Sequence, residues 1–307
     1  MILKKKKNMA TKLFGLESRE YEFPLDRKAL MTLTALPGFD KIINAFLNWT
    51  WVKWELIEMK GSNFHVTKQS CPELYNQVLD ACHALNLTDF PQIYTKWGYY
   101  VNAYTMGYKE TTSLVLFSGA IDLLDKDELN FIIGHELGHI KSNHCLYHNM
   151  ALKISQFISD VPIIGDLMGT VRYFLMYWYR MSEFTADRAG LLACQNEEAV
   201  LNSIIKMAGV PQKYYQSIDR NAILEQAREF EALLSGDEQI MKNLSILDDT
   251  HPWTILRAAE LIKWIDSGEY EKIINTHKGK CCTTCNKQVP SNVEHCPYCQ
   301  GDEFQPL

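Results

Sequence analysis

The segment GHELGHIKSNH, residues 134–144, carries residue types that bind a metal ion and activate water. His135 and His139 are four residues apart, so on a helix both imidazoles project from one face and can reach the same zinc ion. Glu136 lies one step round the helix, where its carboxylate would act as a base toward a water molecule on that ion. The spacing therefore predicts two zinc ligands with a catalytic base between them.

A catalytic zinc site takes three protein ligands and keeps a fourth position for water. His144 and His148 follow on the same predicted helix, but His144 turns away from the ligand face, and we expect both to be structural or solvated. The later segment MSEFTADRAG places Glu183 and Asp187 one helical turn apart. We predict that Glu183 is the third ligand and that Asp187 accepts the distal N–H of a ligating histidine, which fixes its tautomer.

The hydrophobic pattern predicts the elements that position these residues. The best helix runs from about Asp127 to Met150, with a capping-box arrangement of Asp125 and Glu128 at its start. Two helices are expected before it within residues 24–59, and helical spacing continues after residue 180. The remaining short elements are a strand at 62–69, a helix at 71–87 and strand-like runs at 91–97, 99–108 and 111–118. This pattern predicts an α+β fold that is mainly helical with a small antiparallel or mixed sheet.

A second cysteine-rich metal site is predicted at the C-terminus. Cys282 and Cys285 form one C-x2-C pair, and Cys296 and Cys299 form another ten residues later. This is the spacing of a four-thiolate zinc ribbon, with Cys281 as a substitute ligand. So short a module lacks a sufficient core of its own, so we expect this structural zinc to fold it. Protein docking or substrate recruitment is its expected role.

Composition limits the partners and the compartment. Acidic residues outnumber basic ones by 37 to 31, so we expect no nucleic-acid partner. The N-terminal residues lack the apolar run of a secretory signal, and the scattered cysteines are those of a reducing, cytoplasmic protein. The apolar segment 161–179 is almost long enough to span a membrane, but Asp166 and Arg172 lie near its middle. We expect a buried helix pair or a surface hairpin there, and membrane association through 161–179 stays open.

Four motifs in a fixed order carry a resemblance to a known family. NAYTMG, HELGH, SEFTAD and THPWTILR make the chain resemble the HtpX-like zinc metallopeptidases, the gluzincin family that also includes the CAAX prenyl endopeptidases. The resemblance runs from about Pro24 to Gly268. It implies a zincin-like peptidase fold, a helix-borne zinc with its third ligand on the SEFTAD helix, and a substrate that lies along the NAYTMG strand. Many relatives carry membrane spans.

The resemblance extends the predicted site beyond the metal ligands. His251 corresponds to the family's His-Pro element, which would support the oxyanion or cover the metal in a resting state. Arg257 could clamp Asp187, bind a substrate carboxylate or pair on the surface. Asn102 and Ala103 would offer backbone groups to an extended substrate by strand addition.

The resulting organisation has four parts. Residues 1–23 form a basic tail and lead-in segment, 24–270 the zinc metallopeptidase domain, 271–280 a linker and 281–307 the zinc ribbon. The domain begins with N-terminal helices over 24–59.

The leading hypothesis is a zinc-dependent endopeptidase that hydrolyses peptide bonds in extended or unfolded segments, as in protein quality control. Glu136 would assist the attack of zinc-bound water. One catalytic and one structural Zn²⁺ are expected, with a protein or peptide as substrate and room for peripheral membrane contact. The alternative is a non-catalytic zinc-binding adaptor or chaperone-like protein. A zinc-ribbon nucleic-acid protein fits the low basic content poorly.

Overall fold

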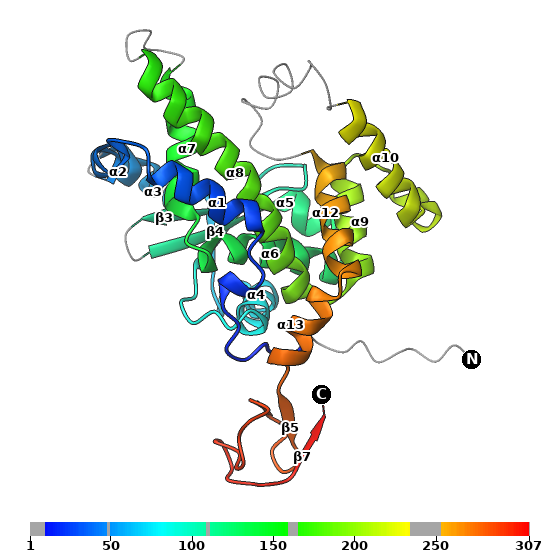
Figure 1. Ribbon diagram of the computed structural model, residues 1–307. Helices are drawn as coiled ribbons and strands as arrows, with labels where there is room; N and C mark the ends of the chain where they lie inside the picture. Colours follow the sequence, from blue (N-terminus) through cyan, green and yellow to red (C-terminus); the bar gives the residue numbers. More distant parts are fainter. Residues whose placement is uncertain (1–9, 48–49, 109–110, 159–164, 234–252, 307) are drawn as a thin grey trace.

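The structure is a computed structural model that describes residues 10–47, 50–108, 111–158, 165–233 and 253–306. The chain is mainly helical with two small sheets (Figure 1), which confirms the predicted mixture of many helices and few strands. One sheet lies within the main body, and the other forms a C-terminal module that projects from it.

The N-terminal part of the chain is more closely packed than a tail. Leu13, Leu16 and Tyr21 are fully buried in the main hydrophobic core, although residues 1–23 are predicted as a tail and lead-in segment. A short 3-10 helix, η1 (Ser18–Glu20), follows them. Residues 1–9, with the basic run of that prediction, lie outside the described residues.

Three helices occupy the region where two are predicted. They are α1 (Pro24–Thr34), α2 (Phe39–Leu47) and α3 (Thr50–Ser62). Pro24 begins α1 because its fixed φ suits the first helical turn. The break between α1 and α2 falls at Pro37-Gly38, where Gly38 adopts a φ of +83°, a conformation that glycine accepts without steric cost.

The larger sheet is mixed and has the strand order β1-β2-β4-β3. Strands β2 and β4 are parallel, and the β1–β2 and β3–β4 pairs are antiparallel. Strand β3 is therefore an edge strand. The strands and the two helices between or after them are β1 (Phe64–Val66), α4 (Pro72–Ala84), β2 (Gln92–Lys96), β3 (Ala103–Tyr108), β4 (Thr111–Phe117) and α5 (Ser118–Leu123).

The predicted Asp127–Met150 helix is two helices, α6 (Lys126–Lys141) and α7 (Cys145–Ile158). The capping box is present: the Asp125 carboxylate accepts from the backbone of Glu128, and the Glu128 carboxylate accepts from the Asp125 N–H at 2.7 Å. The break follows Ser142 because Asn143 adopts a φ of +58°, which ends the helix. The chain therefore changes direction shortly after the HELGH motif.

Helix α8 (Gly165–Cys194) crosses α6 closely in the centre of the molecule (Figure 1). Gly134 and Gly138 of α6 face Ala193 and Ala189 of α8, and a Cβ on either glycine would lie about 2.5 Å or less from the alanine Cβ. Larger side chains at these positions would push the helices apart. The small residues thus bring Glu183 of α8 next to the HELGH helix.

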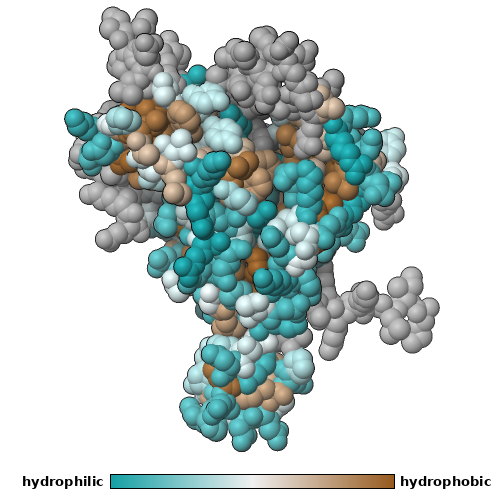
Figure 2. Space-filling view, viewed as in Figure 1, coloured by the Kyte–Doolittle hydropathy of each residue, from teal (hydrophilic) through white to brown (hydrophobic). Residues whose placement is uncertain are grey.

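The first part of α8 covers most of the apolar segment 161–179. Val171, Leu175 and Trp178 are buried in a second hydrophobic cluster with Leu33 of α1 and Phe39 of α2. Among the described residues, none of the helices combines the length and apolarity that a membrane span requires. Figure 2 shows a mostly hydrophilic surface on this side, with separate apolar patches, one of them over the region of α1 and α2.

The remaining helices lead to the C-terminal module. Helix α13 begins after Gly268 and buries Tyr270 and Ile273, so most of the predicted linker 271–280 is helical. The loss of a long apolar repeat in this short helix explains the difference. The elements are α9 (Glu197–Met207), η2 (Gln212–Ser217), α10 (Arg220–Leu233), α12 (Thr254–Asp266), α13 (Glu269–His277), β5 (Lys280–Cys282), β6 (Gln288–Val289) and β7 (Phe304–Pro306).

Candidate metal centre and active site

Three buried side chains from two helices meet at one point. His135 and His139 of α6 bring their Nε2 atoms within 3.2 Å of each other. The Glu183 carboxylate of α8 places one oxygen 3.4 Å from His135 Nε2 and the other 3.4 Å from His139 Nε2. The three residues predicted as metal ligands therefore converge.

Their spacing fits a zinc ion. A tetrahedral zinc with bonds of about 2.0–2.1 Å separates its ligand atoms by about 3.4 Å. The observed separations of 3.2, 3.4 and 3.4 Å are close to that value. One carboxylate and two imidazoles are also the donor set of many catalytic zinc sites. The residues present thus fit the metal in both chemistry and geometry.

Two further residues orient His135. Its Nδ1 lies 3.0 Å from Asp187 Oδ1, so the N–H at Nδ1 donates to this carboxylate and Nε2 faces the other ligands. Arg257 of α12 donates to both oxygens of Asp187, at 2.6 and 2.8 Å. Three partners were considered for Arg257, and in the structure it forms an ion pair with Asp187.

The electrostatics around His135 favour a cation. Burial would lower the pKa of His135, but contacts with Asp187 and Glu183 outweigh it and raise the pKa to about 9. Without metal, the buried cluster of His135, Asp187 and Glu183 therefore holds a proton on the imidazole. Because a metal ion displaces that proton from its ligand, the same surroundings suit zinc.

A second histidine cluster adjoins the ligands. His139 Nδ1 lies 3.0 Å from His144 Nδ1, and His148 Nε2 lies 2.7 Å from the Ser182 hydroxyl. His144 and His148 are both buried, so the solvated alternative is wrong for them. On one continuous helix His144 would turn away, but the break at Asn143 returns it to His139. The helix-ending pair Ser142-Asn143 was the sequence signal for this arrangement.

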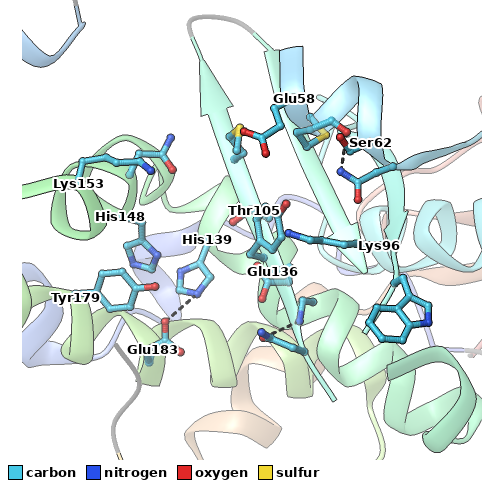
Figure 3. A pocket seen from close by; sticks show the side chains of 18 residues that line it. Glu58, Ser62, Lys96, Thr105, Glu136, His139, His148, Lys153, Tyr179 and Glu183 are labelled. Carbon is cyan, nitrogen blue, oxygen red and sulfur yellow. Dashed lines mark hydrogen bonds and ion pairs between the residues drawn. The ribbon is translucent and has the colours of Figure 1, made fainter. Parts of the chain in front are cut away.

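Glu136 occupies the position expected of a base. It lies in the same cleft as His139 and Glu183 (Figure 3). Burial, assisted by the negative charge of Glu183, raises the pKa of Glu136 to about 7, whereas His135 acts in the opposite direction. A carboxyl group with a pKa near neutrality can accept and return a proton.

The cleft beside these residues has a volume of about 590 Å³ and is bounded by β3 on one side and by α7 and α8 on the other. Thr105 of β3 lies next to Glu136 in this cleft (Figure 3), and the two side chains are hydrogen-bonded. Asn102 and Ala103 also line the cleft. The Asn102 carbonyl already accepts from Phe117, however, and the Asn102 side chain accepts from the Ala103 N–H.

Alternation along β3 identifies the backbone groups that face the cleft. Because the Asn102 carbonyl pairs with β4, the backbone groups of Ala103 and Thr105 point to the free edge. The Ala103 N–H is taken by Asn102. The Ala103 carbonyl and the Thr105 backbone are therefore the better positioned groups for strand addition.

Tyr179 is a cleft residue that sequence reasoning missed. It lies one helical turn before Glu183 on α8, and its ring stacks on His148 with centroids 3.9 Å apart. In Figure 3 its hydroxyl points toward His139 and Glu183. Burial, with Glu183 and Glu136 nearby, raises its pKa well above the ordinary value, so the hydroxyl keeps its proton. The four-residue spacing from Glu183 was the available signal.

His251 lies outside the described residues, so its predicted position beside the metal stays a prediction.

The four cysteines of the C-terminal module come together, with all four Sγ atoms within 4.8 Å of one another. Sγ of Cys282 lies 3.5 Å from that of Cys299, and Sγ of Cys285 lies 3.6 Å from that of Cys296. A tetrahedral zinc with Zn–S bonds of about 2.3 Å needs about 3.8 Å. The module's donor set therefore fits zinc.

Comparison with known proteins places this site in context. The family model for peptidase family M48 matches residues 69–265. The chain is 29% identical over 262 residues to the plastoglobule-localized metallopeptidase 48 of Arabidopsis thaliana, which covers 84% of this chain and 76% of that protein. It is 25% identical over 198 residues to a protease HtpX homolog of Helicobacter acinonychis, with 56% and 64% covered.

Among solved structures, the crystal structure of S. mikatae Ste24p aligns with 82% of this chain and 68% of that chain, at 15% identity and a TM-score of 0.35. The family match contains the HELGH helix and the helix that carries Glu183 and Asp187, whose side chains meet in the structure. The resemblance to the HtpX-like metallopeptidases is thereby confirmed, and the chain belongs to peptidase family M48.

Proposed function

We propose that the chain is a zinc-dependent endopeptidase that cleaves extended or unfolded protein segments. The observation that carries this proposal is the meeting of His135, His139 and Glu183 beside Glu136 in a cleft. A purely structural zinc would have no use for a buried carboxylate with a raised pKa at its side. The proposal agrees with membership of a metallopeptidase family.

Zinc, when bound by His135, His139 and Glu183, would polarise the scissile carbonyl and increase the acidity of a water molecule. Glu136 would take a proton from a water molecule in the cleft as the water oxygen attacks the carbonyl carbon of the substrate. As the C–N bond breaks, Glu136 gives that proton to the departing nitrogen. The raised pKa of Glu136 suits both transfers.

Tyr179 would supply a further donor for the carbonyl oxygen. Peptide hydrolysis places negative charge on this oxygen, and a fixed hydrogen-bond donor stabilises that charge. The Tyr179 hydroxyl has no hydrogen-bond partner among the described residues, and the ring is held by its stack on His148. For His251 we propose one of two roles: a second hydrogen-bond donor to this oxygen, or a side chain that covers the metal in a resting state.

The substrate would bind as an additional strand on β3. Backbone pairing with Ala103 and Thr105 selects an extended chain and depends little on its side chains. Such a geometry favours unfolded segments over folded domains. The apolar side chains of Met59, Met106 and Trp97 line the same cleft and would contact the substrate's side chains.

We assign a second, structural zinc to Cys282, Cys285, Cys296 and Cys299 in a C-terminal zinc ribbon. Its small sheet buries few side chains: Cys282, Val289 and Cys296 form the fully buried cluster. So small a core gives little stability, so the metal would supply most of it. We propose protein docking or substrate recruitment as the module's task.

The test of the enzyme proposal is the Glu136→Gln variant. It keeps the side-chain size but cannot take a proton, so zinc content should stay at the wild-type value while cleavage of casein falls by at least about 100-fold. Asp122→Asn changes a solvent-exposed carboxylate on helix α5 in the same way and is the matched control. It should cleave casein at the wild-type rate. Equal cleavage by wild type and Glu136→Gln would remove Glu136 from the mechanism, and no cleavage by the zinc-loaded wild type would overturn the proposal and favour an adaptor.

A further inference from the structure

A buried carboxylate on the N-terminal helix accepts hydrogen bonds from three side chains, two of them on α8 and one in the turn between α6 and α7. Asp26 of α1 is 1% exposed. Its Oδ1 accepts from Trp178 Nε1 at 2.8 Å, and its Oδ2 accepts from the Thr185 hydroxyl at 2.5 Å. His144 Nε2 lies 3.3 Å from the same Oδ2. A charged group this deep is stable only when it is paired and hydrogen-bonded, and Asp26 is both.

The direction of these hydrogen bonds can be assigned from what each atom is able to do. Burial would raise the pKa of Asp26, but hydrogen bonds from His144, Thr185 and Trp178 outweigh it and lower the pKa, so the carboxylate is ionised. An ionised carboxylate only accepts. His144 must therefore carry its proton on Nε2, and in the neutral form its Nδ1 is an acceptor.

This assignment fixes the tautomer of His139. Its Nδ1 lies 3.0 Å from His144 Nδ1, so His139 must donate from Nδ1 to an acceptor there. The lone pair of His139 is then on Nε2, the atom that faces His135 and Glu183. This is the only neutral tautomer of His139 that can bind a metal at that point.

We propose that Asp26 and His144 form a positioning relay that presents His139 Nε2 to the metal. The relay has the same form as the support of His135. His135 donates its Nδ1 proton to Asp187, which Arg257 holds in place. His139 likewise donates its Nδ1 proton to His144, which Asp26 holds in place. The relay rests on the proposed metal site but needs no assumption about turnover.

The relay brings a part of the chain outside the family match to the metal centre. Asp26 precedes the matched residues 69–265 by more than forty positions. Because α1 packs along α8 through Trp178 and Thr185, the N-terminal helix and the zinc ligand Glu183 share one support. Displacement of α1 should therefore weaken metal binding without any change in the ligands themselves.

The Asp26→Asn variant tests the relay directly, because an amide can present its N–H₂ group to His144. His144 must then accept on Nε2 and donate from Nδ1, which moves the His139 proton to Nε2, where the metal would bind. We expect zinc affinity at the histidine site to fall by about 10–100-fold, the usual effect of losing such support. The measurement is chelator competition on the full chain, with the cobalt(II) spectrum used to distinguish histidine and carboxylate ligands from thiolates.

Two substitutions at position 144 separate the relay from simple packing. His144→Asn can still accept from His139 Nδ1 through its side-chain oxygen, so it should retain most of the affinity. His144→Leu cannot accept and should lose it. Asn196→Ala is the stability control, since it removes the side-chain cap of α9 and touches no residue of the relay. It should lower the melting temperature of the metal-free chain without weakening zinc binding.

Each result has one meaning. If wild type binds zinc at the histidine site and Asp26→Asn binds it equally tightly, the relay is wrong while the proposed function stands. If wild type binds no zinc there, the proposed metal site itself fails. Where a variant unfolds, histidine nitrogen NMR on metal-free wild type decides: a proton on His139 Nδ1 supports the relay, and a proton on Nε2 overturns it.

Discussion

Gly138 of α6 and Ala189 of α8 are in such close contact that a Cβ on Gly138 would lie 2.5 Å from the Ala189 Cβ. This contact sets the distance between the helix that carries the histidines and the helix that carries Glu183. The 3.4 Å separations between Glu183 and the two imidazoles depend on it, because a shift of either helix would move Glu183 away from both.

The first prediction concerns this contact. Gly138→Ala should destabilise the chain by about 1–3 kcal/mol through overpacking and should also weaken zinc binding. Thermal unfolding with and without chelator measures both effects. Gly61→Ala on α3, where an added Cβ meets nothing within 4 Å, is the matched control and should be neutral or slightly stabilising. A Gly138→Ala chain as stable as Gly61→Ala would show that the helices do not depend on the contact.

The second prediction concerns the buried pair of Arg257 and Asp187. Arg257→Ala leaves the Asp187 charge buried without its main partner, so the free energy of unfolding should fall by about 3–5 kcal/mol. Denaturant unfolding checks this value. Arg228→Ala breaks an exposed pair with Glu225 and should change the stability by less than about 0.5 kcal/mol. Similar effects of the two substitutions would contradict the importance of the buried pair.

Sequence spacing was sufficient to predict which candidate site residues share a helix face, because both pairs lie on single helices. His135 with His139, and Glu183 with Asp187, are each four residues apart, and the helical repeat fixes which side chains share a face. The long-range meeting of the two helices depends on small residues such as Gly138, whose role becomes visible only when both helices are in place.

The supporting residues of His139 could not be found in this way. A single residue, Asn143, takes a left-handed conformation and divides one predicted helix into two, which reverses the direction of His144. Asp26 lies more than a hundred residues from His144, and no local pattern connects them. An apolar helical pattern is also no guarantee of burial, since Trp54 on α3 is 63% exposed.

The third prediction concerns the Tyr179 hydroxyl. Tyr179→Phe keeps the ring and its stack on His148 but removes the donor, so kcat should fall by about 100–1000-fold with little change in KM or zinc content. Steady-state cleavage of a fluorogenic peptide measures this. Tyr173→Phe, on an earlier and more exposed turn of α8, is the control and should be neutral. An unchanged kcat for Tyr179→Phe would remove this residue from the proposed mechanism.

The fourth prediction concerns metal content. The full chain should bind two zinc ions, with one lost on Glu183→Ala and the other on Cys296→Ser. Chelation of the cysteine site should also unfold the C-terminal module, because its buried cluster is too small to hold it without metal. Metal analysis and proteolysis of the variants test this. A Cys296→Ser chain with two zinc ions and an intact C-terminal module would contradict the assignment of four thiolate ligands.

We propose that His135, His139 and Glu183 hold one zinc ion beside Glu136. Anomalous scattering at the zinc edge, from crystals of the zinc-loaded full chain, tests it most directly. We expect a peak about 2.0–2.1 Å from His135 Nε2, from His139 Nε2 and from a Glu183 oxygen, with one coordination position open to the cleft. A zinc-loaded crystal with density only at the cysteines, or with a protein atom in that open position, would contradict it.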